Sequence, residues 1–250
     1  MQDVVERALQ KLSWQGKSLL AAGRTDTGVH ATGQVIAFDL EWNHPPEELR
    51  QALNASLPLD VVARQVHPVP ASFHPRRDAS SRTYHYHIFF ENVRDPLRER
   101  YAWRVWPAAD VKMLQQAAQE LVGKHDFAAF GTPPHAKSST VRRVFQADWQ
   151  QDASGDPDSW VFVVRAEAFL YHMARRMVSL QVEIAQGRLA IDDLRKFLQP
   201  AERKEGEQPD LVQGLAPPNG LVLAEVSYPQ GKVFRSDLSE IDDFVTRKLS

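Results

Sequence analysis

The chain has 250 residues, of which 43% are hydrophobic and 25% are charged, and its formal net charge is -2 at pH 7. This composition is typical of a globular protein with one large domain or two closely joined halves. It has no run of eighteen apolar residues and no basic flank or apolar stretch of a secretory signal, so we expect no membrane segment and a cytoplasmic location. The lack of cysteine excludes disulfides, thiolate metal sites and cysteine nucleophiles.

The first hundred residues combine two helical patterns with short apolar runs. Residues 3–14 place their apolar side chains on one stripe of an amphipathic helix, which must pack on another element. Prolines and acids fill residues 45–48, as in a first helical turn, so a second helix is predicted to extend to residue 57. Strands are predicted at residues 18–22, 34–39, 60–67 and 80–90.

The pattern lapses into charges and aromatics between residues 92 and 109, where we place a junction. This predicts an N-terminal α+β half at 1–105 and a C-terminal α+β half at 106–250. In the second half, helices are predicted at 110–122, 169–186 and 191–198, and strands at 141–150, 160–168 and 221–228. Helices that interrupt pairs of hairpin-like strands indicate an α+β fold with a largely antiparallel sheet.

A loop with a central aspartate, Asp26, lies between the first two predicted strands. The loop is bracketed by Gly23 and Gly28, which tolerate backbone angles that other residues avoid, so the carboxylate is expected to be held in a fixed direction. Asp followed by Thr and Gly is also the sequence of an ordinary turn, because Asp bonds its own backbone and Gly supplies positive φ. The loop alone does not decide between a turn and a site.

The strand predicted at 80–90 carries two sets of polar side chains on opposite faces. Arg82 and Tyr84 share one face, where an aromatic ring and a guanidinium could stack on a base and hold a phosphate; a core tyrosine beside a surface arginine is the alternative. His85 and His87 share the other face, but no third ligand stands at a metal-binding spacing, so no metal site is predicted.

The helix predicted after Phe169 places Arg175 beside its apolar surface. An arginine near a core is costly unless an acid pairs with it, and Asp26 is the acid already expected at a sheet edge. The alternative is an arginine whose stem packs against the protein while its head stays in water.

Basic residues gather in local groups although the net charge is negative, and such groups can bind phosphates. The group at 94–104 is interleaved with acids and is interpreted as a solvated face. The other groups are Arg76, Arg77 and Arg82; Lys137, Arg142 and Arg143; and Arg165, Arg175 and Arg176.

Four runs resemble, in order, the motifs of the tRNA pseudouridine synthase A (TruA) family. The resemblance spans nearly the whole chain, and four ordered matches are far more specific than one short motif. The runs are Gly23-Arg24-Thr25-Asp26-Thr27-Gly28-Val29-His30-Ala31, Ser81-Arg82-Thr83-Tyr84-His85-Tyr86, Phe169-Leu170-Tyr171-His172-Met173-Ala174-Arg175 and Ala216-Pro217-Pro218-Asn219-Gly220-Leu221.

The resemblance implies a pseudouridine synthase fold, in which two α/β halves with a mainly antiparallel mixed sheet flank a central cleft. It implies a homodimer that acts without cofactor or metal on uridines 38 to 40 of the tRNA anticodon stem-loop. Asp26 matches the catalytic aspartate, Tyr84 the tyrosine that packs on the target base and Arg175 the arginine that pairs with the aspartate. Arg24 matches the arginine that fills the gap left by a flipped nucleotide. Arg24, Arg82, Lys137, Arg142 and Arg143 are the candidates for RNA contacts.

The chemistry fits these residue types. Pseudouridine formation breaks a carbon–nitrogen glycosidic bond and makes a carbon–carbon bond without net redox change, so it calls for no redox cofactor. An ionised carboxylate can assist as a covalent nucleophile or through an elimination route, and the sequence leaves both open. Arg175 would favour the charged carboxylate, and Tyr84 could stack on the detached uracil and help to remove the C5 proton.

Two departures and two alternatives accompany the resemblance. Ala174 and Arg176 stand where the family more often has valine and asparagine, and the chain starts directly at the first helix, so we expect one strand of the first half to be missing. An aspartic protease needs two carboxylates that share a proton, but the chain has a single Asp-Thr-Gly. A non-catalytic RNA-binding protein is the second alternative.

Overall fold

The computed structural model describes residues 1–135, 138–200 and 211–229. Contacts between Cα atoms divide the chain into two compact units. Unit 1 consists of Met1–Ala22, Ile36–Asp78 and the described residues from Tyr228, and unit 2 consists of Gly23–Val35 and Ala79–Ser227.

Unit 1 is a pair of helices with a small sheet. Helices α1 (Gln2–Lys11) and α2 (Pro46–Ser56) accompany strands β1 (Leu20–Ala21) and β3 (Ile36–Ala37), which pair antiparallel. Proline at the start of α2 and two acids in its first turn suit a helix N-terminus. The apolar stripe of α1 packs as predicted, in a core of Ala8, Leu9, Trp14, Leu19, Leu49 and Leu53.

The strand predicted at 60–67 is wrong, because that segment has no strand partner in the structure. The side chain of Asn54 bonds both backbone groups of Ala63: Nδ2 donates to the carbonyl at 2.9 Å and Oδ1 accepts from the N–H at 2.7 Å. A side-chain amide therefore takes the place of a neighbouring strand at this point.

Unit 2 is built on a seven-stranded sheet. Most strand pairs are antiparallel, while β2 with β9 and β4 with β5 are parallel, so the expected α+β class with a mainly antiparallel mixed sheet is confirmed. In sheet order the strands are β2 (His30–Ala31), β9 (Leu221–Ser227), β4 (Ser81–Phe90), β8 (Ser159–Ala166), β7 (Val141–Gln151) and β6 (Gly123–Asp126), with β5 (Trp103–Val105) beside β4.

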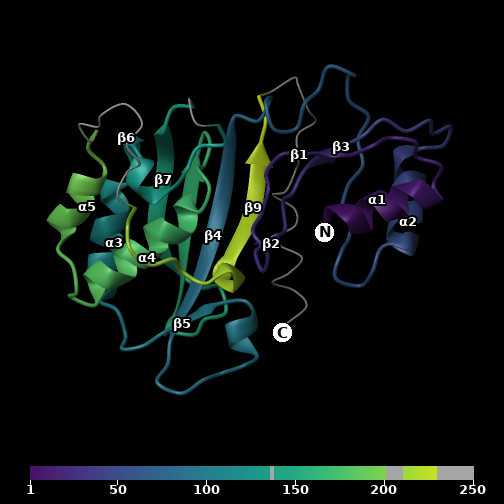
Figure 1. The fold of residues 1–250 in the computed structure, drawn as a ribbon. Coiled ribbons are helices and arrows are strands. Elements are labelled where there is room, and N and C mark those ends of the chain that lie inside the picture. The colour runs from purple at the N-terminus through teal and green to yellow at the C-terminus, as the bar shows by residue number, and fades with distance from the viewer. Residues whose placement is uncertain (136–137, 201–210, 230–250) are drawn as a thin grey trace. The chain divides into compact units, whose positions relative to one another are not determined.

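Three helices cover one face of this sheet: α3 (Val111–Glu120), α4 (Met173–Ala185) and α5 (Ile191–Phe197) (Figure 1). Their apolar side chains join those of β4, β7 and β8 in one core. Short 3-10 turns lie at Arg98–Arg100 (η1), Ala128–Phe130 (η2) and Pro218–Gly220 (η3). No helix in the described part of the chain is long and apolar enough to cross a membrane.

The helix predicted from residue 169 starts four residues later, at Met173. Tyr171 instead forms an antiparallel bridge with Thr132, and His172 takes a left-handed conformation with φ 67° immediately before the helix. The short strands β2, β5 and β6 were not predicted, because two to four residues are too few for a periodic pattern.

The two compact units do not follow the division into 1–105 and 106–250. Strand β4 lies between β9 and β8, so residues before and after the junction share one sheet. The Asp26 loop, expected in the first half, belongs to the same unit as α4. The two halves stay a prediction.

Candidate active site

The Asp26 loop contains a well-defined turn. The N–H of Val29 donates to the carbonyl of Asp26 at 3.1 Å, and Gly28 has φ +86° at the third position of the turn. A positive φ at this position is what a type II turn requires, and glycine adopts it without strain. The residues therefore form the ordinary turn that the sequence allowed, and the turn carries the carboxylate.

The two ends of the loop are fixed by different contacts. The Gln34 side chain donates to the Gly23 carbonyl at 2.8 Å and accepts from its N–H at 3.4 Å. The φ of Gly23 is not in the left-handed region, so its role differs from the predicted one: a Cβ there would lie 3.9 Å from the Tyr84 hydroxyl. Downstream, Thr32 and Gly33 both donate backbone N–H groups to the Leu223 carbonyl. The loop is thus attached to β9 and closely approaches β4.

The predicted contact between Asp26 and Arg175 is present in the structure. Arg175 Nη1 lies 2.8 Å from Asp26 Oδ2, and its Nε donates to the carbonyl of Ala216 at 2.7 Å. The exposed fractions of the two side chains are 10% for Arg175 and 22% for Asp26. Both charges are largely removed from water, so the loss of either partner would leave the other charge without compensation.

His172 is a site residue that sequence reasoning missed. Its Nε2 lies 3.3 Å from the same Oδ2 of Asp26, and its pKa is lowered mainly by burial, with Arg175 and Arg176 acting in the same direction and Asp26 opposing them. Oδ1 of Asp26 makes no hydrogen bond with any described residue. The available signal was the place of His172 in the same short run as Arg175, three residues earlier in the sequence.

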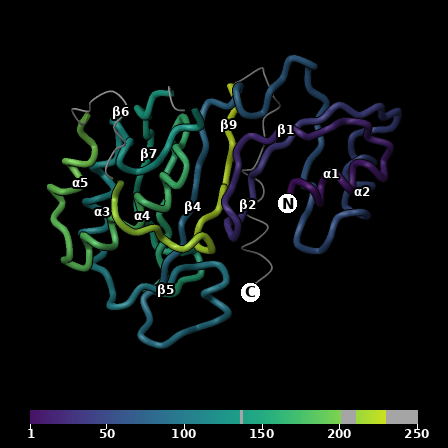
Figure 2. The backbone as a smooth tube through the Cα atoms, in the orientation of Figure 1, coloured from purple at the N-terminus to yellow at the C-terminus, as the bar shows by residue number. Residues whose placement is uncertain are grey.

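The Ala216-Pro217-Pro218 run joins the parts of the site. Ala216 accepts from Arg175, Pro217 accepts from the Tyr86 hydroxyl at 2.7 Å, and Pro218 lies against Gly28, whose Cβ position is 3.0 Å from the proline Cγ. In Figure 2 this yellow-green segment runs past α4 before it enters β9. This segment, which the sequence showed only as a motif, therefore contacts helix α4, strand β4 and the Asp26 turn.

Tyr84 lies near the carboxylate in a mostly apolar setting. Its ring meets Phe169 edge to face, with centroids 4.8 Å apart. Burial raises the pKa of Tyr84 to about 12, with a further upward contribution from Asp26 and an opposing one from Arg82. Tyr84 is therefore a neutral phenol at neutral pH.

The structure brings some of the predicted RNA-contact residues together. Arg82 Nη1 donates to the Glu167 carbonyl at 3.0 Å, and the Glu167 carboxylate accepts the backbone N–H of Arg143 at 3.0 Å, so both arginines lie at the end of β8. Arg24 is exposed in the turn and has no ion pair with a described residue. Arg142 donates to the Ser139 and Val141 carbonyls. Lys137 lies outside the described residues.

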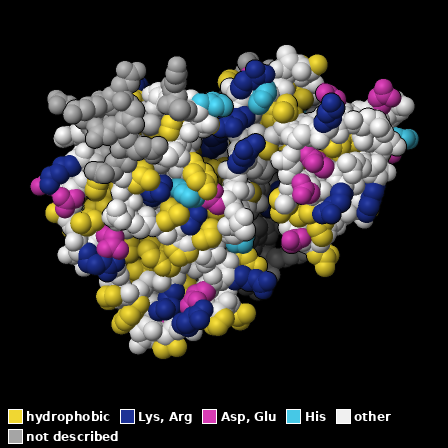
Figure 3. Space-filling model, in the orientation of Figure 1, with side chains coloured by type: hydrophobic (Ala, Val, Ile, Leu, Met, Phe, Trp, Pro, Cys, Tyr) yellow, Lys and Arg dark blue, Asp and Glu magenta, His cyan; other side chains and the backbone are white. Residues whose placement is uncertain are grey.

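Three arginines of the group at 94–104, which was interpreted from the sequence as a solvated face, contact acids in the structure. Arg94 and Arg104 both contact Glu99, and Arg98 contacts Asp156 at 2.6 Å. In the lower part of Figure 3, basic and acidic side chains lie next to each other on the surface. These arginines are therefore partly neutralised within the protein.

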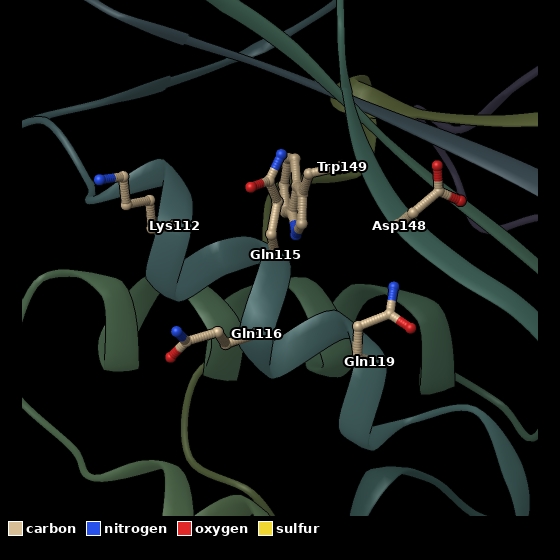
Figure 4. Close-up of a pocket in the computed structure, with 6 residues that line it drawn as sticks. All are labelled: Lys112, Gln115, Gln116, Gln119, Asp148 and Trp149. Carbon is tan, nitrogen blue, oxygen red and sulfur yellow. The ribbon is translucent and has the colours of Figure 1, made fainter.

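Two other polar groupings lie apart from the Asp26 cluster. His87 Nδ1 is 3.1 Å from Asp152, and no set of three or more metal-binding side chains gathers anywhere in the described part of the chain. An open hollow between α3 and β7 involves no residue of the Asp26 cluster (Figure 4). It is lined by Lys112, Gln115, Gln116, Gln119, Asp148 and Trp149.

The fold and site define an α+β protein with a pre-set turn that holds an ion-paired carboxylate beside a tyrosine. The family model described as tRNA pseudouridine synthase matches residues 1–78 and 117–229. The chain belongs to the tRNA pseudouridine synthase family.

Individual relatives agree with the family match over most of their length. The chain is 37% identical over 231 residues to the tRNA pseudouridine synthase A of Limosilactobacillus fermentum. This match covers 91% of this chain and 86% of the relative. It is 34% identical over 233 residues to that of a Geobacter species, with 92% and 90% covered. It is 38% identical over 230 residues to that of Syntrophotalea carbinolica, with 91% and 86% covered.

Proposed function

We propose that this protein converts uridine to pseudouridine in tRNA, at positions 38 to 40 of the anticodon stem-loop, with Asp26 as the catalytic carboxylate. Family membership supports the reaction. The observation that carries the assignment is the unequal surroundings of the two carboxylate oxygens. Arg175 and His172 both contact Oδ2, whereas Oδ1 has no hydrogen bond within the described residues.

The free oxygen suits the chemistry of the reaction. The bond between uracil N1 and ribose C1′ breaks, a bond between C5 and C1′ forms, and the C5 proton leaves, so electrons balance without a redox partner. Oδ1 of Asp26 assists the first step by attacking C1′ or by taking a ribose proton in an elimination route. Arg175 stabilises the charged carboxylate in both routes, because its guanidinium is held by Ala216 as well as by Asp26.

Tyr84 is assigned the role of packing on the uracil while it turns. Its ring is already supported by Phe169, so it is ordered before substrate arrives. Since its pKa is about 12, the hydroxyl carries its proton at neutral pH and acts first as a hydrogen-bond donor. The hydroxyl can accept the C5 proton only after it has transferred its own proton to another group.

The target uridine must leave its base stack, which costs about a few kcal/mol. The basic residues are proposed to offset this cost through phosphate contacts. Arg24 extends from the catalytic turn and is proposed to fill the gap left by the flipped nucleotide. The remaining candidates for phosphate contacts are Arg82, Lys137, Arg142 and Arg143.

The assembly and setting complete the proposal. We place the protein in the cytoplasm as a homodimer that needs no cofactor or metal. The homodimer and the lack of a cofactor or metal rest on the family resemblance, and the cytoplasmic location rests on the sequence. Sedimentation of the purified protein at several concentrations tests the homodimer, and a monomer at all concentrations would contradict it.

The experiment that tests the function is tritium release from tRNA labelled at uridine C5. We expect release from transcripts with uridine at positions 38 to 40, and loss of release when all three are replaced by cytidine. Release that persists after the replacement would contradict the anticodon assignment. RNA binding without release from any tRNA would instead support a non-catalytic RNA-binding protein.

A further inference from the structure

Tyr171 combines a fixed backbone with an exposed ring. Its N–H donates to the Thr132 carbonyl at 3.0 Å within an antiparallel bridge, and a Cβ on Gly131 would come within 2.3 Å of the Tyr171 carbonyl oxygen. The neighbouring backbone therefore closely confines this position. The residue is nevertheless 59% exposed, and its hydroxyl has no hydrogen bond to any described residue.

The ring of Tyr171 is ordered by the residue that contacts the catalytic carboxylate. It stacks on the imidazole of His172, with centroids 3.7 Å apart and an interplanar angle of 28°. On the same imidazole, Nε2 lies 3.3 Å from Asp26 Oδ2. One ring therefore separates Tyr171 from the carboxylate.

An exposed aromatic ring in this position has a natural ligand if the protein acts on RNA. Nucleobases stack on aromatic side chains with little dependence on sequence, because every base has a π-face. A ring held by its backbone and by a second ring loses little conformational entropy when a base adds to the stack. The exposure of Tyr171 and the single ring that separates it from Asp26 both fit such a contact.

We propose that Tyr171 is a stacking platform for a nucleobase of the substrate RNA next to the reacting uridine, with His172 as the ring that supports it. This rests on the proposed function, because the ligand is the RNA whose uridine reaches Asp26. The alternative is an apolar cover that only shields His172 from water. An apolar cover needs only bulk, which leucine also supplies, whereas a stacking platform needs a flat aromatic ring. Replacement by leucine therefore distinguishes the two roles.

The test compares Tyr171→Phe, Tyr171→Leu and the wild type. Dissociation constants are measured by fluorescence anisotropy with a labelled tRNA transcript. We expect Tyr171→Phe to bind within about twofold of the wild type and Tyr171→Leu to bind about 5-fold to 100-fold more weakly. The slope of log affinity against log salt should stay unchanged in both variants, because no phosphate contact is removed.

Tyr101 provides the matched control. It is also 59% exposed and also lies against a histidine, His30, with ring centroids 5.2 Å apart. Tyr101→Leu should bind within about twofold of the wild type. Wild-type affinity of Tyr171→Leu, or equal losses in both leucine variants, would overturn the proposal, and thermal melting checks that each variant is folded.

The outcome is separable from that of the proposed function. Selective weakening of binding in Tyr171→Leu supports the platform even if the wild type releases no tritium. Conversely, the wild type could release tritium while Tyr171→Leu binds RNA with the same affinity as the wild type. That result would support the proposed function and reject the platform.

Discussion

At the residue scale, the two oxygens of Asp26 have different surroundings. Oδ2 is held by a guanidinium and an imidazole, while Oδ1 is left without a partner among the described residues. Since a charge that is largely removed from water needs compensation, Arg175 is the residue whose loss should destabilise this arrangement most. The roles of Asp26, Tyr84 and Arg175 in catalysis stay predictions, and the variants below test them.

Arg175→Met should reduce turnover more than RNA binding. It removes both the contact to Asp26 and the donor to Ala216, so we expect kcat to fall about 100-fold to 1000-fold. Stability should fall by on the order of 3 kcal/mol, because a mostly buried carboxylate loses its counter-charge. Tritium release and urea unfolding measure the two effects.

The control for this variant is Arg188→Met. Arg188 pairs with Glu183 near the end of α4, where both side chains are more exposed. Such pairs contribute about 0–1 kcal/mol, so activity and stability should change little. Turnover of Arg175→Met equal to that of the wild type would show that the ion pair has no role in the reaction.

His172 gives the protein a pH-dependent term in stability. Its pKa is lowered in the folded state, so the unfolded chain binds a proton more readily as the pH falls below 6.5. The contribution of neutral His172 to the free energy of unfolding is fully present above the pKa that this residue has in the unfolded chain. It is lost as the pH falls toward the lower pKa of the folded state. The wild type should therefore lose more stability between pH 7.5 and pH 5 than His172→Asn.

Asparagine is the suitable replacement because it tolerates the left-handed backbone at this position. Urea unfolding at each pH measures the difference in free energy. Identical pH dependence in the two proteins would mean that burial does not perturb this imidazole.

At the element scale, the site depends on how a turn, a helix start and an irregular segment meet. The turn at Asp26–Val29 directs the carboxylate, the start of α4 supplies His172 and Arg175, and Ala216–Pro218 connects them. The first turn of a helix also favours a nearby negative charge. Small changes in the turn should therefore affect catalysis without unfolding the sheet.

Gly28→Ala tests this dependence. The residue has φ +86°, and a Cβ would lie 3.0 Å from Pro218 Cγ, so the substitution both strains the turn and presses on the connecting segment. We expect a loss of about 1–2 kcal/mol in stability and about a 10-fold loss in kcat. Urea unfolding and tritium release give the two numbers.

Gly155→Ala is the matched control, because Gly155 has φ +77° but no atom within 4 Å of its Cβ position. It should lose about 1 kcal/mol in stability and keep wild-type turnover. If both variants retain full turnover, the position of the Asp26 turn does not control the reaction.

The sequence predicted elements with long periodic patterns better than it predicted contacts. Strands β4, β7, β8 and β9 and helices α1, α2, α3 and α5 lie where expected, because each buries one face. The segment at 60–67 was wrongly predicted as a strand, because an apolar pattern does not reveal that the Asn54 side chain bonds the backbone of Ala63. His172 was missed because a helix was predicted from residue 169, whereas the residue lies before the helix in a left-handed conformation that the apolar pattern does not indicate.

At the scale of the whole molecule, a net charge of -2 is compatible with RNA binding only if basic side chains are placed locally. Arg82 and Arg143 lie together at the end of β8, whereas the arginines at 94–104 are engaged by acids. Because Arg94 and Arg104 already pair with Glu99, they should contribute less to a phosphate contact than Arg143. Charge distribution, and not total charge, is therefore the relevant property.

Arg143→Gln and Arg94→Gln should separate the two kinds of arginine. Removing a phosphate contact at Arg143 should weaken binding to all RNA sequences and reduce the salt slope by about 1. Arg94→Gln should leave the slope unchanged, because Arg94 already pairs with Glu99. Anisotropy titrations over a range of salt concentrations measure the slopes, and equal slopes in the two variants would contradict the assignment.

The most direct test of the central claim is tritium release by Asp26→Asn from tRNA labelled at uridine C5. The amide keeps the size of the side chain and removes its charge. We predict a loss of release of at least about 1000-fold with RNA affinity within about threefold of the wild type, in a variant that still melts cooperatively. Release by Asp26→Asn at the wild-type rate would contradict the assignment of Asp26 as the catalytic carboxylate.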